Sequence, residues 1–358
     1  MFKNIIITSP SLNAKYNVSG ISSITQFIID NNKLCKYIHF EIGKKDNERG
    51  GIFRIFAILK CIFLWWKLLS KHPDAIIHYN FPLSKASIIR DPVFIFIAYY
   101  RKRRLVIHIH GGIFLTSSTI PPYLSYLLKK VFLLKVPFIV LSSIEEKQVK
   151  TKFNCQKVFV LPNCVNLHEA QNYTREKNSK NILKIGYLGR ITETKGMDFL
   201  LRACIELKKK NIPFILEIAG KEEIMNKYIP EFIIKLGNNF SYKGVVSGKT
   251  KYDFLKDIDI FILPSFFEGL PMSLIECMSF GVVPVTTNVG SIREIVSDEI
   301  NGLYIEVKNS TSIYNKIVKL NDNRELLYNL SVNAKDFIFK NFDVVNYIDK
   351  LNNIYSKV

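Results

Sequence analysis

The sequence predicts an α/β protein that contains two doubly wound domains. Three observations support this prediction: the chain has 358 residues, short apolar runs alternate with longer segments of helical periodicity, and a polar break at residues 168–180 interrupts the alternation. A chain of this length predicts two domains, because one domain ordinarily holds about 100–200 residues. Apolar strands that are separated by helices indicate βαβ units, in which both faces of a parallel sheet are covered.

In the first half of the chain, continuous apolar runs predict strands, and the longer segments between them predict helices. The strands are expected at residues 4–8, 36–41, 75–79, 105–110, 138–141 and 157–161. The helices are expected at residues 22–31, 53–69, 84–100, 122–134 and 143–152. Together these elements predict a first domain at residues 1–167.

The polar segment HEAQNYTREKNSK at residues 168–180 is typical of an interdomain linker. Beyond it, strands are expected at 183–188, 214–219, 258–263, 282–286 and 302–305, and helices at 196–210, 225–236, 249–256, 272–280 and 310–320. From Asp322 to the end the pattern is helical throughout. We therefore expect a second domain at 181–340 and a final helix at 341–358.

The composition excludes a disordered chain and indicates a polyanionic partner. Hydrophobic residues make up 48% of the sequence and charged residues 23%, which is globular composition. The net charge is +19, and residues 1–165 hold 24 Lys and Arg against 8 Asp and Glu. A surplus of this size suits a nucleic acid, an anionic lipid or a phosphorylated substrate, and we expect that partner to bind the first domain.

The cysteines and the N-terminus indicate a cytoplasmic protein. None of the six cysteines is paired with another at the spacing of metal ligands, and several lie inside apolar runs, which favours buried free thiols over disulfides. The segment MFKNIIITSPS has an apolar run too short for a signal peptide and is better interpreted as a first strand.

The segment IFRIFAILKCIFLWWKLL at residues 52–69 is the one stretch that resembles a membrane span. It carries Arg54, Lys60 and Lys67, and three cations argue against spanning. Two interpretations remain: a partly buried amphipathic helix of an α/β domain, or a helix that lies on an anionic membrane with Trp65 and Trp66 near the headgroups.

Open α/β sheets bind ligands at the carboxyl ends of their strands, where helix N-termini supply backbone N–H groups. In the segment LPSFFEGLPMSLIECMSFGVVPV at residues 263–285, Glu268 lies in such a loop and Glu276 in the following helix. The loop around Gly269, Leu270 and Pro271 is suited to binding an anion, and Glu276 to accepting hydrogen bonds from sugar hydroxyls. Taken alone, Glu276 is better interpreted as a helix-surface carboxylate and Glu268 as a partner of the helix dipole in the first turn.

Three further positions are candidate ligand-binding residues. Arg190 and Lys195, in IGYLGRITETKGM, suit a diphosphate, although a solvated loop with ordinary cations has the same pattern. His110 lies where the strand HIH opens into two glycines; no third zinc ligand follows at a recognisable spacing, so no metal is expected. Gly20 precedes a helix and permits close approach of the backbone to a phosphate, or is a plain turn glycine.

These motifs together resemble the retaining glycosyltransferases of the GT-B fold, in the group-1 (family-four) class that uses nucleotide sugars. The resemblance is specific over about residues 160–310 and rests on short motifs: GR at 189–190, KG at 195–196, EGLPMSLIE at 268–276, MSFGVVPV at 278–285, GSIREIV at 290–296, NGL at 301–303 and LPN at 161–163. It implies two Rossmann-like domains that face each other across a cleft, with a C-terminal helix that crosses back to the first domain.

The resemblance also implies a role for each matching residue on the nucleotide side of the donor. Arg190 and Lys195 would hold the diphosphate, Glu276 would bind the ribose, and Val245 in YKGVV would offer backbone contacts to the base. No metal or other cofactor is implied, because cationic side chains and a helix N-terminus take the place of the metal.

On the sugar side, the resemblance assigns Glu268, with the backbone of residues 269–271, to the donor sugar near the reacting carbon. His110 would lie close to the donor hexose, and Gly20 would approach the phosphates when the domains close. The sequence departs from the family pattern in three places: LPNCVN at residues 161–166, Cys277 where Ala is usual, and Ser19 where a second glycine is common.

The function that follows is retaining transfer of a hexose from a nucleoside diphosphate sugar, UDP more than GDP, to a glycan hydroxyl. We expect a lipid-linked acceptor, such as a polyprenyl-pyrophosphate-linked glycan, in assembly of lipopolysaccharide or capsule. The first domain is basic and contains four consecutive cations, RKRR at residues 101–104. It predicts peripheral attachment to the inner face of the cell membrane. One alternative is a nucleotide-sugar epimerase or a phosphorylase on the same fold. A second is a nucleic-acid-binding module, although the sequence shows no recognition motif for one.

Overall fold

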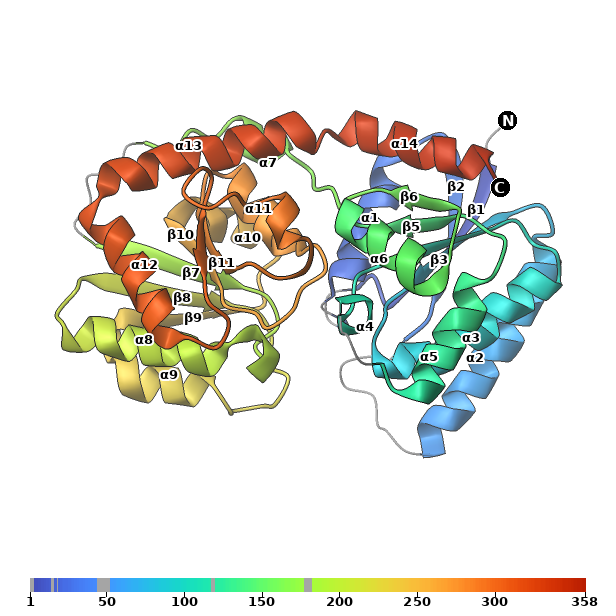
Figure 1. Cartoon of the computed structure of the whole chain (residues 1–358), viewed down its shortest axis with the longest axis horizontal. Helices are drawn as coiled ribbons and strands as arrows, with labels where there is room; N and C mark the ends of the chain where they lie inside the picture. The colour runs from blue at the N-terminus through green and yellow to red at the C-terminus, as the bar shows by residue number, and fades with distance from the viewer. Residues whose placement is uncertain (1–2, 14–15, 18, 44–51, 117–119, 177–181) are drawn as a thin grey trace. The chain divides into compact units, whose positions relative to one another are not determined.

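The computed structural model of the chain contains two compact units (Figure 1). It describes residues 3–13, 16–17, 19–43, 52–116, 120–176 and 182–358. Unit 1 comprises Met1–Cys164 together with Val344–Val358, and unit 2 comprises Val165–Asp343. Unit 1 holds 26 Lys and Arg against 9 Asp and Glu, a net charge of +17, whereas unit 2 holds 24 against 22. The surplus of positive charge therefore belongs to unit 1.

Unit 1 is built on a parallel six-stranded sheet with the order β2-β1-β3-β4-β5-β6. The strands are β1 (Lys3–Ser9), β2 (Cys35–Glu41), β3 (Ile76–Phe81), β4 (Leu105–Ile109), β5 (Phe138–Val140) and β6 (Val158–Val160). The helices are α1 (Gly20–Asn31), α2 (Ile52–Lys71), α3 (Lys85–Tyr100), α4 (Ile113–Thr116), α5 (Pro122–Phe132) and α6 (Ser143–Phe153). The central strands are apolar runs, as expected of strands covered on both faces.

Helices α2, α3 and α5 cover one face of this sheet. Trp65, Phe94 and Leu128, one from each helix, are fully buried in a single core cluster with Tyr79 and Ile107 of the sheet. The indole of Trp65 also donates a hydrogen bond of 3.0 Å to the carbonyl of Phe94. Burial of Trp65 supports the interpretation of this segment as a partly buried helix of an α/β domain, and it excludes Trp65 from contact with headgroups.

The C-terminal helix α14 (Val344–Ser356) packs on unit 1 beside α1. The ring of Tyr347 meets Phe27 edge to face at 5.6 Å, and Asn352 accepts a hydrogen bond of 2.9 Å from Asn32. The hydroxyl of Tyr355 lies 2.6 Å from Nδ1 of His78 in β3. The expected return of the last helix to the first domain is therefore observed.

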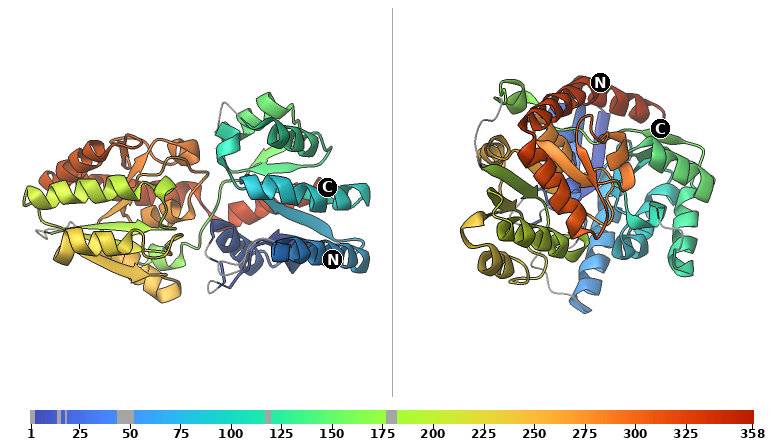
Figure 2. Two further views of the ribbon diagram at one scale, coloured as in Figure 1. Left: turned by 90° about the horizontal axis from the view of Figure 1, so that it is seen from below. Right: turned by 60° about the vertical axis from the view of Figure 1, so that its left-hand side comes forward.

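Unit 2 repeats the architecture with a parallel sheet in the order β12-β11-β10-β7-β8-β9, and the views in Figure 2 show both sheets between helices. Its strands are β7 (Leu183–Leu188), β8 (Phe214–Ala219), β9 (Phe240–Gly244), β10 (Ile260–Leu263), β11 (Val283–Thr287) and β12 (Leu303–Ile305). Its α-helices are α7 (His168–Gln171), α8 (Met197–Lys209), α9 (Ile229–Leu236), α10 (Gly248–Asp257), α11 (Met272–Ser279), α12 (Ser310–Asp322) and α13 (Arg324–Asn341). The α/β fold class with doubly wound parallel sheets is confirmed.

The segment expected to be a linker contacts unit 2 over its described part. Tyr173 donates a hydrogen bond of 3.0 Å to the carbonyl of Lys256, and Arg175 donates one of 3.1 Å to the carbonyl of Leu255. The guanidinium of Arg175 also lies 3.5 Å from the carboxylate of Asp259. These bonds hold residues 173–175 on unit 2.

Two sequence expectations in unit 2 were wrong. Strand β9 was not expected, because FSYKG is an edge strand with exposed residues and has no continuous apolar run. The helix expected from residue 225 begins only at Ile229. The carboxylate of Glu222 accepts the backbone N–H groups of Tyr228 and Ile229 at 2.6 and 2.9 Å, so it caps the helix there.

Among the described residues, the helices lack the combination of length and apolar character that crossing a bilayer requires.

Candidate functional site

In unit 2 the sequence-predicted residues gather at the point where the strand order reverses. β7 has β8 on one side and β10 on the other, and chain order jumps from one side of β7 to the other between β9 and β10. Loops that leave two neighbouring strands in opposite directions open a crevice at their carboxyl ends. Arg190 and Lys195 follow β7, and Glu268 follows β10, so the three lie at this position.

Lys195 and Glu268 form an ion pair, with Nζ 2.5 Å from Oε1. The Ser265 hydroxyl donates to the same carboxylate oxygen at 2.7 Å. The side chain of Glu268 is only 9% exposed, whereas that of Lys195 is 27% exposed. The carboxylate is thus held on the protein side while the ammonium keeps access to solvent, and Lys195 can meet a second anion there.

Backbone packing fixes the two loops that carry this pair. Gly196 and Gly290 both have left-handed backbone conformations, with φ of +76° and +54°. A Cβ at Gly196 would lie 2.2 Å from the carbonyl oxygen of Pro264, and one at Gly290 would lie 1.8 Å from that of Glu268. Only glycine allows these approaches, so both loops are packed closely against their neighbours.

The N-terminus of α11 lies in the same loop. Pro271 occupies the N-cap position without a side-chain hydrogen bond, so the positive end of the helix dipole is not neutralised by its own cap. Leu270 is buried, while Gly269 and Pro271 are partly exposed. The carbonyl of Gly269 accepts a hydrogen bond of 3.2 Å from the backbone of Ser291. The loop is therefore held in place where its backbone can contact a ligand.

Tyr187, in β7, binds the loop that follows this strand. Its hydroxyl is buried and donates a hydrogen bond of 2.5 Å to the carbonyl of Arg190. Burial, and then the negative charge of Glu268, raise the pKa of Tyr187 well above its usual value, so this hydroxyl remains a donor. The side chain of Arg190 is exposed on this loop.

Glu276, in α11, forms a second ion pair that the sequence did not indicate. Its Oε1 lies 2.7 Å from Nζ of Lys251 in α10, and both side chains are at most one quarter exposed. Burial lowers the pKa of Lys251, but the charge and the hydrogen bond of Glu276 raise it more, so Lys251 has a raised pKa and stays charged. Glu276 is thus held by a cation on one side and is partly open on the other.

Val245 is separated from this group. It follows the edge strand β9 and is 47% exposed. Since β9 is two strand positions from β7, β8 lies between Val245 and the strand that leads into the Lys195 loop. The structure therefore brings Lys195 and Glu268 into contact but leaves Val245 at the edge of the sheet.

In unit 1, His110 lies at the carboxyl end of β4 and is anchored to β3. Its Nε2 lies 2.6 Å from Oδ1 of Asn80. The amide nitrogen of Asn80 donates to the Thr8 carbonyl at 2.6 Å and to the Thr25 hydroxyl at 3.0 Å, so Oδ1 is the acceptor and His110 donates. In the neutral ring, Nδ1 of His110 is then an acceptor. Asn80 was not predicted from the sequence.

His110, itself partly buried, belongs to a cluster of three histidines with the fully buried His78 and His108. His78 and His108 are 3.0 Å apart between Nε2 and Nδ1, and the rings of His108 and His110 have centroids 4.1 Å apart. Burial lowers the pKa of His78 to about 4 and, with the nearby His78, that of His110 to about 3. Burial also lowers the pKa of His108 well below its usual value. All three are neutral at pH 7.

Gly20 is the first residue of α1 and is exposed. The side chain of Ser19 caps this helix by accepting the backbone N–H of Ser22 at 3.2 Å. The backbone of Gly20 is not left-handed, so a close approach by a ligand, rather than its own conformation, would be the reason for a glycine there. Gly20 and His110 both lie at the carboxyl edge of the unit 1 sheet.

Ser265 and Lys251, which hold the two glutamates, carry little sequence signal. Ser265 is a serine in a loop three residues before Glu268, and Lys251 is one of several lysines on an amphipathic helix. Lys251 contacts Glu276, which is 25 positions away in the chain. Ser265 reaches Glu268 only because of the turn of the loop that holds both residues.

The family model described as "Glycosyl transferases group 1" matches residues 169–337, which include the Lys195–Glu268 and Lys251–Glu276 pairs. Residues 169–337 belong to the group 1 glycosyltransferases. The UDP-Gal:alpha-D-GlcNAc-diphosphoundecaprenol alpha-1,3-galactosyltransferase of Escherichia coli is 27% identical over 232 residues, 59% of this chain and 58% of that protein. The chain spans about half the length of the curated relatives that it matches.

The family model covers only residues 169–337, but solved structures resemble the fold of nearly the whole chain. Sucrose-phosphate synthase from Thermosynechococcus elongatus has a TM-score of 0.79 at 14% identity, covering 99% of this chain and 98% of that one. HepE of Anabaena, in complex with UDP and glucose, has a TM-score of 0.76 at 15% identity, covering 99% and 100%. The chain has the GT-B fold.

The neutral histidine cluster predicts acid sensitivity of unit 1. Because the pKa of a buried histidine is lower in the folded state than the usual 6.5, its contribution to stability is complete above pH 6.5 and is lost as the pH falls toward the folded pKa. We expect on the order of 3 kcal/mol of destabilisation for one such histidine at pH 4. Both tryptophans lie in α2, so denaturant unfolding followed by their fluorescence reports on unit 1.

The variant His108→Gln should give a shallower decrease in stability between pH 6.5 and 4. His168→Gln, which changes an exposed histidine in unit 2, should leave the profile unchanged. An unaltered slope in His108→Gln would contradict the assignment of the acid sensitivity to the cluster.

Proposed function

We propose that the chain is a retaining glycosyltransferase, which moves a hexose from a nucleoside diphosphate sugar to a hydroxyl of a glycan acceptor. The observation that carries the proposal is the Lys195 ammonium, held by Glu268 beside the N-terminus of α11. It lies in the segment that belongs to the group 1 glycosyltransferases. A fixed cation and a helix N-terminus together form a site for a diphosphate.

On the nucleotide side, Lys195 and Arg190 stabilise the charge on the departing diphosphate, so the reaction needs no metal ion and no other cofactor. Glu276, oriented by Lys251, accepts hydrogen bonds from the ribose hydroxyls. Val245 offers its backbone to the base from the end of β9. UDP is the expected nucleotide; the HepE structure named above contains UDP and glucose, which supports this choice for a protein of the same fold.

On the sugar side, Glu268 positions Lys195 and the backbone of Gly269 contacts the donor hexose. The ammonium 2.5 Å from Glu268 and the Ser265 hydroxyl stabilise its negative charge, which makes the carboxylate a weak nucleophile. Retention is then best explained by reaction on one face of the sugar. The bond from the anomeric carbon to the diphosphate breaks, the acceptor oxygen bonds from the same face, and its proton passes to the leaving diphosphate.

Unit 1 contributes two groups to this proposal. His110 is neutral, and its Nδ1 accepts a hydrogen bond from a hydroxyl of the donor hexose while Nε2 remains bonded to Asn80. Gly20, at the start of α1, allows the donor phosphates to approach the backbone.

The acceptor that we propose is a lipid-linked glycan in the assembly of a bacterial surface polysaccharide such as lipopolysaccharide or capsule. The name of the Escherichia coli relative gives a diphosphoundecaprenol-linked sugar as its acceptor and UDP-Gal as its donor. The reaction would take place in the cytoplasm at the inner face of the cell membrane, with no nucleic acid involved.

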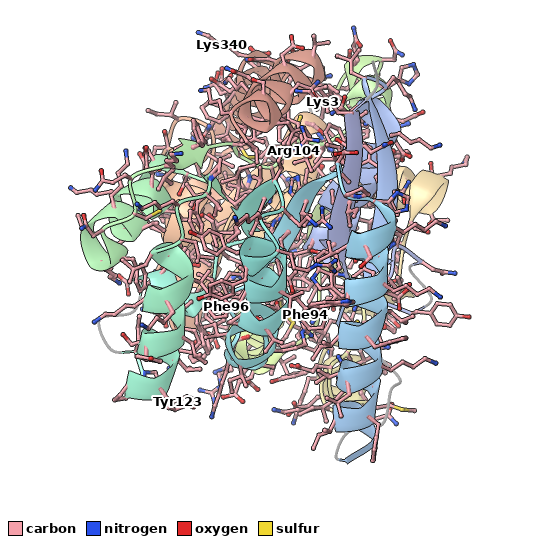
Figure 3. The ribbon with its side chains drawn as sticks, turned by 90° about the vertical axis from the view of Figure 1, so that its right-hand side faces the viewer. Lys3, Phe94, Phe96, Arg104, Tyr123 and Lys340 are labelled. Carbon is pink, nitrogen blue, oxygen red and sulfur yellow. The ribbon has the colours of Figure 1, made fainter. Side chains whose placement is uncertain are left out.

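The surface of unit 1 supports peripheral attachment to an anionic membrane. Figure 3 shows α2, α3 and α5 side by side on one face, and together these helices hold eight Lys and Arg and a single acidic residue, Asp91, which is buried. Their solvent-exposed residues include many large apolar side chains: Ile55, Phe56, Leu59, Phe63, Leu64, Trp66, Ile89, Val93, Tyr100, Tyr123 and Tyr126. Apolar side chains among cations are typical of a surface that lies in the interface of an anionic bilayer.

Transfer should depend on the Lys195–Glu268 and Lys251–Glu276 ion pairs of unit 2. We expect Lys195→Ala and Glu276→Ala to abolish transfer without unfolding the chain, because each removes a charged group that holds the donor. The measurement is nucleotide release from a panel of UDP- and GDP-hexoses, with product analysis. Lys209→Ala and Glu231→Ala, exposed residues on α8 and α9, are matched controls that should keep wild-type activity. Wild-type turnover in either site variant, or an epimerised donor as the product, would contradict the proposal.

Attachment should require both the charge of the membrane and the apolar residues of α2. The chain should sediment with anionic vesicles but not with neutral ones, and high salt should release it. Phe63→Ser combined with Trp66→Ser should weaken the partitioning about 10-fold or more, since burying one such side chain contributes about 1.5–3 kcal/mol. Ile234→Ser, at a residue 76% exposed in unit 2, is the control. Equal binding to neutral and anionic vesicles would exclude this mode of attachment.

A further inference from the structure

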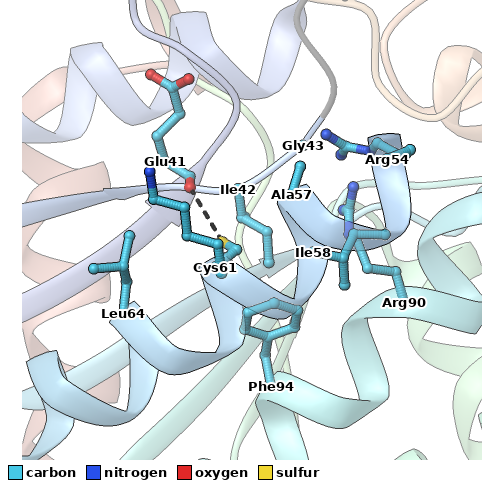
Figure 4. Close-up of a pocket in the computed structure, with 11 residues that line it drawn as sticks. Glu41, Ile42, Gly43, Arg54, Ala57, Ile58, Cys61, Leu64, Arg90 and Phe94 are labelled. Carbon is cyan, nitrogen blue, oxygen red and sulfur yellow. Dashed lines mark hydrogen bonds between the residues drawn. The ribbon is translucent and has the colours of Figure 1, made fainter. Parts of the chain in front are cut away.

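A pocket of about 400 Å³ lies in unit 1, outside the candidate donor site (Figure 4). Residues 41–43, at the end of β2, form one side of it, and the N-terminal part of α2 and the middle of α3 form the others. This volume falls in the range that small-molecule sites occupy. The pocket is also at the carboxyl edge of the sheet, the edge at which ligands of doubly wound domains bind.

One end of the pocket is cationic. Figure 4 shows the side chains of Arg54 and Arg90 at the same end. Asp91, fully buried behind the pocket, binds Nε of Arg90 at 2.5 Å and so fixes the plane of this guanidinium. A fixed guanidinium beside a second one suits the oxygen atoms of a phosphate or diphosphate. The carboxylate of Glu41, also a lining residue, is turned away from this end.

Apart from Glu41, Lys60 and Cys61, the rest of the lining is apolar. Ile58, Leu64 and Phe94 form the wall, and Ala57 leaves space between them. Leu64 is also 44% exposed and belongs to the apolar outer surface of α2 described above. The apolar wall is therefore continuous with the surface proposed to lie in the membrane interface.

We propose that this pocket binds the phosphate or diphosphate head of an anionic amphiphile, a phosphate ester of a long apolar alcohol, whose chain runs out along α2 into the membrane. The assignment rests on the proposed function, because it identifies this amphiphile as the lipid part of the acceptor. Charge alone would favour any phosphate; the apolar wall and the exposed face of α2 favour one that carries a lipid chain.

The position of the pocket fits an acceptor that is presented to His110. β2 and β4 are separated by three strand spacings, about 14 Å, in the order β2-β1-β3-β4. Both the pocket and His110 follow the carboxyl ends of these parallel strands. A sugar joined to the bound diphosphate would extend along this edge toward the histidine.

The test is binding of farnesyl diphosphate to the full chain, measured by calorimetry below its micelle concentration, with inorganic diphosphate and farnesol as the partial ligands. We expect farnesyl diphosphate to bind at least 10-fold more tightly than either. Equal affinity for inorganic diphosphate would overturn the lipid assignment in favour of a free phosphate, and equal affinity for farnesol would show that the arginines play no part.

Two variants locate the binding. Arg54→Gln removes one guanidinium and should weaken binding of farnesyl diphosphate about 10-fold or more. Ala57→Phe fills the pocket without changing its charge and should have a similar effect. Lys67→Gln removes an equal charge from the same helix outside the pocket and should change the affinity less than 2-fold. Unchanged binding in folded Arg54→Gln would overturn the proposal.

Binding of UDP, measured on the same samples, separates this proposal from the proposed function. UDP should bind Arg54→Gln and Ala57→Phe as it binds the wild type, because its site is in unit 2. A wild-type chain that binds farnesyl diphosphate through Arg54 but does not bind UDP would support the pocket and overturn the proposed function. The opposite pattern would overturn the pocket alone.

Discussion

The ion pair between Lys195 and Glu268 is the interaction on which the proposed chemistry of unit 2 depends. A carboxylate that is 9% exposed is costly unless it is paired, and Lys195 and Ser265 supply its partners. The two charged residues are 73 positions apart in the chain and meet because β7 and β10 are neighbours at the reversal of the strand order. The sheet topology thus determines where the ammonium stands, and Gly196 and Gly290 allow the loops to pack around it.

Unit 1 is organised around a different constraint. Its buried polar groups at the carboxyl ends of β3 and β4 form a connected set that runs from Tyr355 of α14 through His78 to His108, with His110 beside it. Burial keeps the histidines neutral, so the positive charge of this unit lies on its helices and loops. This separation is consistent with the proposed roles, in which unit 1 binds an anionic membrane and a lipid and unit 2 binds the donor diphosphate.

Much of this was predictable from the sequence, and the reasons are local. Buried parallel strands are continuous apolar runs, so all strands except β9 were expected; β9 is an edge strand with polar, exposed residues. Loops that follow strands identified Arg190, Lys195, Glu268 and His110 as candidates. What the sequence could not show was pairing over distance. Lys251 and Asn80 are common residue types, and their partners are 25 and 30 positions away in the chain. Ser265 is only three residues from Glu268, but the turn of the loop decides whether the two meet. Likewise, the sequence does not distinguish Trp65 from Trp66, whereas in the folded helix Trp65 is buried and Trp66 is exposed.

The central claim is that the fixed Lys195 ammonium and the N-terminus of α11 form a site for a diphosphate. The most direct measurement is a comparison of the affinities of UDP and UMP for the wild-type chain at one salt concentration. Since the second phosphate would meet a cation and backbone N–H groups, we predict that UDP binds about 10-fold or more tightly than UMP. Equal affinities would mean that the charged groups do not contact the diphosphate, and would contradict the account.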